Sequence, residues 1–194
     1  MNIFRALHRA RFPILTIAAT YLLAVLLGVA MVHWQNHFAL ARRDKLVSDA
    51  QQSSILTQLN VGHPFRAATL DFAGNLVGGI SSTVSGLCVP LAYPMVAYRG
   101  WVGGIVSVDG EPKSRLAHRR SAVYYAAVLL MQILPYSLAG GAGVNVGIPL
   151  FRANIRSEPH WGIFPLEPLR DAARIYVLVV PLFLIASLVE FYFA

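Results

Sequence analysis

The feature that most constrains the fold is a long uncharged stretch in the middle of the chain. Between Asp71 and Arg99 there are 27 consecutive uncharged residues, and these two are the only charged residues from Ala67 to Val108. A single helix over that range would be about 63 Å long, roughly twice the ~30 Å hydrocarbon core of a bilayer. Pro90 and Pro94 interrupt helical hydrogen bonding near its middle. The stretch therefore predicts two membrane crossings joined by a turn near Cys88, whose thiol we expect to be buried.

Small residues recur at every fourth position on both arms of this predicted hairpin, and again later in the chain. In lipid, helices associate through close backbone approach, so such faces predict helix packing. We expect one face to be used within the hairpin itself, and at least one other to meet another chain. The predicted packing positions are Gly74, Gly78, Ser82, Gly86, Gly100, Gly104, Ala139, Gly143 and Gly147.

The composition predicts an all-α, polytopic membrane protein. The chain is 56% hydrophobic and only 13% charged, whereas soluble domains are about 25% charged. A single integral membrane domain, 1–194, is the simplest organisation. About five transmembrane helices are predicted, at 12–34, 67–87, 90–108, 120–150 and 172–193. Pro135 is expected to break the fourth of these, either as a kink or as a full span followed by a re-entrant piece at 138–150.

The first 66 residues predict a membrane anchor followed by a polar helical segment. Phe12 to Val32 is uncharged for 21 residues, longer than the apolar region of about 7 to 15 residues typical of a secretory signal peptide. Ala39 to Leu59 lacks Gly and Pro and is expected to form a helix. Its weak apolar stripe fits a helix on the membrane surface or against a partner, and a solvated extension of the first span is the alternative.

The net charge of +7 comes from basic residues in short segments between apolar spans. Lipid headgroups are their expected partners, so we predict no nucleic-acid binding. Five spans place eight Lys and Arg on each side of the membrane. The positive-inside rule therefore gives a tie, and only the arginines before the first span favour an inside N-terminus.

Polar residues inside predicted spans are the candidate functional groups, because they are costly in lipid. Asp71 and Asn75 lie four residues apart and share a helix face. Asp71 and Arg99 lie on opposite arms of the hairpin, where they can either pair or reach separate interfaces. The full set is Asp71, Asn75, Arg99, Gln132, Asn145 and Glu190.

No pattern in the sequence predicts catalysis or a cofactor. The serines at 81, 82, 85 and 137 have no predicted base beside them and are expected to bond to their own helices. His33 and His37 have the spacing of one helix face, but no cysteine or carboxylate cluster joins them. We therefore expect no enzyme activity, no metal and no cofactor.

Several motifs in the second half of the chain resemble those of a known family. They are Asn75 to Gly79, Tyr98 to Gly104, Leu134-Pro135, Ala139 to Gly147, and Val180 to Tyr192. In this order they resemble the stage II sporulation protein M family of integral membrane proteins, over roughly residues 65 to 193. The chain departs from that family at Arg99, where an asparagine is usual, and at Tyr136-Ser137, which replace a His-Gly pair that a glutamate follows.

The resemblance implies a membrane component that helps to organise cell-wall remodelling complexes. We therefore predict a non-enzymatic scaffold or subunit in the bacterial cytoplasmic (inner) membrane, whose partners are the lipid bilayer and other membrane subunits or copies of itself. The alternative is a permease-type subunit of an ABC-associated transporter, in which the segment from Pro135 to Gly147 lines a path. An intramembrane hydrolase is a third, weaker hypothesis.

Overall fold

A computed structural model of the chain describes residues 2–108, 119–155 and 165–192. The elements in these ranges are α1 (Ile3–His33), α2 (His37–Gln51), α3 (Ser54–Asn60), α4 (Pro64–Leu87), α5 (Val89–Val106), α6 (Arg119–Ile155) and α7 (Leu166–Tyr192). The predicted all-α class is confirmed. Three described segments are long and apolar enough to cross a membrane, namely α1, Leu129–Arg152 within α6, and α7; α4 and α5 are not among them.

Helix α6 is the centre of the bundle. In the apolar 18-residue stretch of α6, 67% of the residues are buried in the protein, whereas the figure is 22% for the corresponding stretch of α1 and 33% for that of α7. Its buried residues join those of α1, α5 and α7 in one continuous core. The apolar faces of α1 and α7 that point outward are free to meet lipid, whereas α6 is covered by its neighbours.

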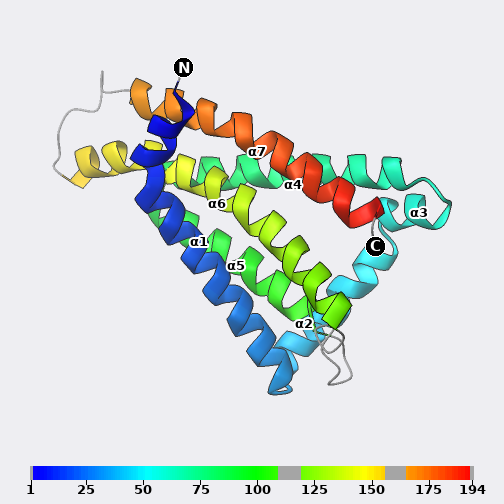
Figure 1. Cartoon of the computed structure of the whole chain (residues 1–194). Coiled ribbons are helices and arrows are strands. Elements are labelled where there is room, and N and C mark those ends of the chain that lie inside the picture. Colours follow the sequence, from blue (N-terminus) through cyan, green and yellow to red (C-terminus); the bar gives the residue numbers. More distant parts are fainter. Residues whose placement is uncertain (1, 109–118, 156–164, 193–194) are drawn as a thin grey trace.

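The prediction that the helix ends at Pro135, with a re-entrant piece after it, is wrong. Helix α6 runs unbroken from Arg119 to Ile155 with Pro135 inside it, so residues 138–150 do not form a re-entrant piece. Pro135 is fully buried, and packing by the surrounding helices offsets the backbone hydrogen bond that a proline removes. The helix changes direction in its last turns, which contain Pro149 (Figure 1).

The two arms of the central hairpin separate instead of packing along each other. Helix α5 lies along α1, and α4 lies along α6 and α7. Figure 1 shows the helices close together where α1 and α7 begin and spread apart toward the other end. We call the first region the closed end and the second the open end. One arm (α1 with α5) and the other (α4 with α7) diverge there, with α6 between them.

The turn of the hairpin is short and is made by Cys88 alone. The backbone N–H of Cys88 donates to Ser85 O at 3.1 Å, and α5 begins at the next residue with Pro90 in its first turn. Proline suits that place because the first N–H groups of a helix have no intrahelical partner. Cys88 is exposed, so the expectation of a buried thiol is wrong.

The predicted helix at 39–59 is two helices, α2 and α3. The side chains of Asn36 and Ser53 cap them, accepting hydrogen bonds from Ala39 N at 3.1 Å and Leu56 N at 3.3 Å. A small second core around Ala39 packs α2 across the ends of α1 and α5. Helix α2 is therefore held against the open end of the bundle.

Candidate functional site

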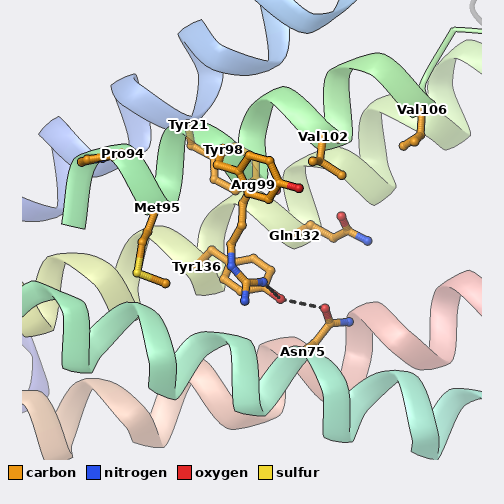
Figure 2. Close-up of a pocket in the computed structure, with 11 residues that line it drawn as sticks. Tyr21, Asn75, Pro94, Met95, Tyr98, Arg99, Val102, Val106, Gln132 and Tyr136 are labelled. Carbon is orange, nitrogen blue, oxygen red and sulfur yellow. Dashed lines mark hydrogen bonds between the residues drawn. The ribbon is translucent and has the colours of Figure 1, made fainter. Parts of the chain in front are cut away.

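A chain of hydrogen bonds links four helices near the open end, and Figure 2 shows its part from Arg99 through Tyr136 to Asn75. Arg99 Nη1 of α5 donates to Tyr136 Oη of α6 at 3.0 Å, and Tyr136 Oη donates to Asn75 Oδ1 of α4 at 2.8 Å. Asn75 Nδ2 then donates to Asp71 Oδ2 at 2.8 Å, which also accepts from Ser187 Oγ of α7 at 2.7 Å. We call these five residues the polar relay.

Asp71 and Arg99 are thus joined indirectly. No ion pair within 4.0 Å forms between them, and Tyr136 and Asn75 stand in the path from one to the other. The prediction that Asp71 and Asn75 share a helix face is confirmed by their hydrogen bond. Direct pairing of Asp71 with Arg99 is not observed, because the arms of the hairpin diverge.

Arg99 reaches across the gap between the arms. Its guanidinium carbon lies 4.8 Å from the centre of the Tyr136 ring, a cation–π contact. It can occupy this place because residue 78 has no side chain: a Cβ at Gly78 would lie 2.6 Å from Arg99 Nη1. In the part of the chain that the structure describes, no carboxylate oxygen lies within 4.0 Å of the guanidinium.

Gln132 and Glu190 lie beside the relay. Gln132 Nε2 of α6 donates to Glu190 Oε2 of α7 at 3.3 Å. Five of the six predicted intramembrane polar residues are therefore gathered in one region. The sixth, Asn145, lies 13 residues beyond Gln132 on α6, about 20 Å along the helix axis. The structure does not bring Asn145 into the cluster.

A cavity opens next to Arg99, between α5, α6 and α4. Its volume is about 730 Å³. Arg99, Tyr136, Asn75 and Gln132 form its polar end, and apolar groups of α5 form much of the rest (Figure 2). The lining residues are Tyr21, Asn75, Pro94, Met95, Tyr98, Arg99, Val102, Gly103, Val106, Gln132 and Tyr136.

Tyr136 and Ser187 were not predicted from the sequence. Tyr136 bonds to both Arg99 and Asn75, and its ring also packs edge-on against Phe183 at 4.8 Å and near Tyr21 at 6.3 Å. Its position four residues after Gln132 places both on one face of α6. That spacing is the sequence feature by which Tyr136 could have been found. Nothing in the sequence distinguishes Ser187 from a small packing residue.

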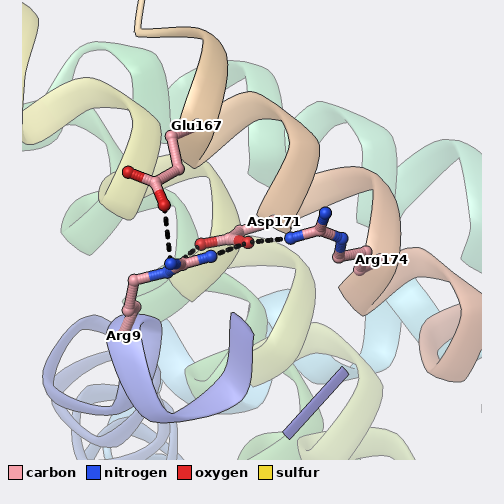
Figure 3. Close-up of polar contacts among 4 residues, drawn as sticks. All are labelled: Arg9, Glu167, Asp171 and Arg174. Carbon is pink, nitrogen blue, oxygen red and sulfur yellow. Dashed lines mark hydrogen bonds and ion pairs between the residues drawn. The ribbon is translucent and has the colours of Figure 1, made fainter. Parts of the chain in front are cut away.

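A second cluster of charged residues lies at the closed end (Figure 3). Arg9 of α1 donates from Nε and Nη2 to the two oxygens of Asp171 of α7, at 2.6 and 2.7 Å. Arg9 Nη1 also donates to Glu167 at 2.6 Å, and Arg174 Nη1 donates to Asp171 at 2.9 Å. Asp171 is only 1% exposed. We call this the ionic cluster; its charges pair with each other directly.

The glycine faces are used within this one chain. A Cβ at Gly104 or Gly100 of α5 would collide with the backbone of α1 at Val25 or Tyr21. The same is true where Gly143 and Gly147 of α6 meet α4. Gly28 of α1, which was not predicted, completes the first interface, where its Cβ would lie 2.5 Å from Trp101 O.

The other predicted packing positions differ among themselves. Ser82 is fully buried, and a Cβ at Gly86 would lie 2.6 Å from Val144 N. The Ala139 carbonyl of α6 accepts a hydrogen bond from Thr83 Oγ1 of α4 at 2.9 Å. Gly74 is exposed, and a Cβ there would meet nothing within 4 Å. Gly74 therefore lies outside the interfaces, because α5 turns away from that part of α4.

The hydroxyls of the serines at 81, 82, 85 and 137 bond to their own helices. Ser81, Ser82 and Ser137 each donate to the carbonyl four residues earlier, at 2.8, 3.0 and 2.6 Å. Ser85 donates to Ser82 O at 2.8 Å. His33 ends α1 and His37 begins α2, so the two histidines do not share a helix. Among the described residues no group of three or more His, Cys, Asp or Glu is placed to hold a metal ion.

Comparison with known proteins adds no relative. No family model matches the chain, and neither a curated protein nor a solved structure matches it.

Proposed function

We propose that this chain is a non-enzymatic integral membrane subunit of a larger complex, with five crossings. The directions of the helices support five crossings. The contacts of Gly100 and Gly104 run along α1 in the order of its sequence, so α5 runs in the same direction as α1. Those of Gly143 and Gly147 run along α4 in the order of its sequence, so α6 runs in the same direction as α4. Two sets of contacts with α6 run in reverse order: Ile14 and Tyr21 of α1 meet Gly141 and Tyr136, and Phe183 and Glu190 of α7 meet Tyr136 and Gln132. Directions therefore alternate along α1, α4, α5, α6 and α7, as five successive crossings require.

The observation that carries the non-enzymatic proposal is how the polar side chains are used. The polar relay ties four helices together through one arginine, neutral groups and one held carboxylate. A nucleophile needs a free base within hydrogen-bonding reach. Ser81, Ser82 and Ser137 donate to backbone carbonyls of their own helix, and the Asp71 oxygen that accepts from Ser187 also accepts from Asn75. Such an arrangement fixes the relative positions of helices.

We further propose that the chain is similar in role to the stage II sporulation protein M family, in the bacterial inner membrane and linked to remodelling of the cell envelope. The motifs that carry the resemblance lie on α4 to α7. Arg99 and Tyr136, which stand at positions where the chain differs from the family, are hydrogen-bonded to each other. If the family's His-Gly segment has an activity of its own, this chain has a phenol bonded to a guanidinium there in place of an imidazole.

The cavity favours a second candidate, a permease-type subunit associated with an ABC transporter. A volume of about 730 Å³, with a cation and amide groups at one end, has the size and character of a ligand pocket. In this candidate the two arms would move relative to each other about α6. The unbroken α6 removes the half-helix on which the sequence had based this alternative.

Photo-crosslinking in intact cells would test both candidates. A photoreactive amino acid at Leu23 of α1 or Leu184 of α7, which are 66% and 42% exposed, would report partners, with fully buried Ile17 as the control. A cell-envelope enzyme that crosslinks at an exposed position, and co-purifies in mild detergent, supports the subunit proposal. An ATPase supports the permease candidate. A protein that purifies as a monomer and crosslinks to no partner contradicts both.

The non-enzymatic proposal has its own test. Serine-to-alanine variants at 81, 82, 85 and 137, expressed in a deletion strain, should restore its growth phenotype as fully as the natural sequence. Loss of complementation by any of them, at normal abundance and melting temperature, would contradict the proposal and favour the hydrolase.

A further inference from the structure

We propose that the cavity beside Arg99 binds the phosphodiester headgroup of an anionic phospholipid, whose acyl chain lies along α5. The proposal rests on the juxtaposition of a half-buried cation, whose partners among the described residues are all neutral, with an open cavity of mostly apolar lining. It requires that the chain lies in a membrane, and it holds whether or not the chain is a subunit of a complex.

Charge is the first argument. An arginine at membrane depth is costly unless an anion or water reaches it, and Arg99 is held by the hydroxyl and the ring of Tyr136. The carboxylates nearest along the relay are engaged elsewhere. Asp71 Oδ2 accepts from Asn75 and Ser187, and Glu190 accepts from Gln132. Because no described carboxylate contacts Arg99, an external anion is the counter-charge that we expect to bind there.

The shape of the cavity is the second argument. Its wall on α5 includes the apolar residues Pro94, Met95, Val102 and Val106, and its polar groups gather at Arg99. A ligand that fits both parts has one anionic group and a long apolar chain. A free inorganic anion would leave the apolar wall uncovered, and a neutral lipid would leave Arg99 without a counter-charge.

Depth is the third argument. Arg99 lies seven residues before the end of α5, about 10 Å along the axis, and membranes thin locally around such an arginine. A second cation stands at the same end: Arg42 of α2 donates from Nη2 to Tyr98 Oη, a lining residue, at 2.6 Å. A headgroup that enters from the open end would meet Arg42 before Arg99.

Specificity for phosphate follows from the geometry of arginine. The guanidinium has five N–H donors in a planar fork that matches two phosphate oxygens. One of them is used by Tyr136, which leaves others for a phosphodiester. A phospholipid with a net negative headgroup should therefore bind better than a zwitterionic one with the same chains.

Native mass spectrometry of the full chain from detergent can measure this preference. The protein is offered equimolar phosphatidylglycerol and phosphatidylcholine with identical acyl chains, and the bound ratio is compared among variants. We expect a preference for phosphatidylglycerol that falls about fivefold in Arg99→Gln, the value of one basic side chain near a lipid surface. Arg99→Lys should retain most of it. Arg11→Gln, an exposed arginine at the closed end, should retain all of it.

A steric variant keeps the test valid if Arg99→Gln fails to fold. Gly103 lines the cavity, and a Cβ there meets only Tyr21 Oη, at 3.9 Å. Gly103→Leu should therefore fold, fill the cavity and lose the bound phosphatidylglycerol. Gly74→Leu adds the same side chain at an exposed site outside the cavity and should retain the lipid.

Three results would overturn the proposal. The first is an equal loss in Arg99→Gln and Arg11→Gln, which would indicate attraction by net charge alone. The second is an equal response of Gly103→Leu and Gly74→Leu. The third is displacement of the lipid by the same concentration of inorganic phosphate, which would indicate a site for the free anion.

Discussion

The closed and open ends of the bundle hold charge in different ways. At the closed end, both oxygens of Asp171 accept from Arg9 at 2.6 and 2.7 Å, so cation and anion neutralise each other. At the open end, Arg99 and Asp71 are separated by Tyr136 and Asn75. One end has a completed ion pair, and the other has two separated charges linked by neutral groups.

The difference follows from how closely the helices approach. Helices α1 and α7 begin side by side (Figure 1), so a single arginine side chain spans the distance between them. Helices α4 and α5 diverge, and Arg99 reaches α4 at Gly78, so its link to Asp71 passes through Tyr136 of α6 and Asn75 of α4. We infer that the ionic cluster fixes the bundle, whereas the relay leaves a cation available to a ligand.

The largest effect is expected where a glycine of the closed end is enlarged. Gly143→Leu would drive a side chain into the backbone of Thr83, which cannot rotate away as a side chain can. The loss in free energy of unfolding should therefore exceed that of ordinary overpacking, which is about 1–3 kcal/mol. Folded protein recovered by size-exclusion chromatography in detergent should fall to a small fraction. Gly103→Leu at the open end is the matched control, and equal recovery of the two variants would contradict the difference between the ends.

The next largest effect is expected from the ionic cluster. Asp171→Asn removes the buried charge that Arg9 and Arg174 share. It leaves Arg174 without this anion and Arg9 with only the exposed Glu167. The melting temperature in detergent should fall by more than it does for any variant of the relay. Glu167→Gln is the control, since that side chain is 70% exposed and surface pairs contribute little. A smaller shift for Asp171→Asn than for Tyr136→Phe would refute the assignment of the ionic cluster as the stronger tie.

A moderate effect is expected from the relay. Tyr136→Phe keeps the ring under Arg99 and its packing against Phe183, but it removes the hydroxyl that joins Arg99 to Asn75. The loss should be about 1 kcal/mol, as for other hydrogen bonds between membrane helices. Its phosphatidylglycerol preference should remain, because the cation remains. A stability equal to that of the natural sequence would show that the relay does not hold the arms.

The smallest effect is expected from the asparagine that the relay excludes. Asn145 is half-buried, and its side chain makes no hydrogen bond to another described residue. Asn145→Ala should change the free energy of unfolding by less than about 0.5 kcal/mol. Asn75→Ala, which breaks two hydrogen bonds of the relay, should cost more. Equal changes in the free energy of unfolding for the two substitutions would mean that the hydrogen bonds of Asn75 in the relay do not stabilise the fold.

Hydropathy and residue spacing were enough to predict the helical membrane character and most residues of the candidate site. Charged and amide residues are few in the apolar stretches, so Asp71, Arg99 and Glu190 were conspicuous without any knowledge of their partners. The contact between Asp71 and Asn75 was also predictable, because a spacing of four residues on one helix fixes their proximity. The glycines at spacing four were visible for the same reason.

Which helices meet could be learned only from the packed fold. The period of a helix shows which residues share a face, but it does not show which other helix packs against that face. The pairing of α5 with α1 and of α4 with α6 could therefore not be predicted. Gly28 has no glycine four residues away to mark it, and Arg9 had the appearance of an ordinary interfacial cation until α7 placed Asp171 beside it. Pro135 marked a break by its own chemistry, yet burial on α6 holds the helix together there. Local rules act through neighbours in the chain, whereas the pairing of distant helices depends on how all their surfaces fit at once.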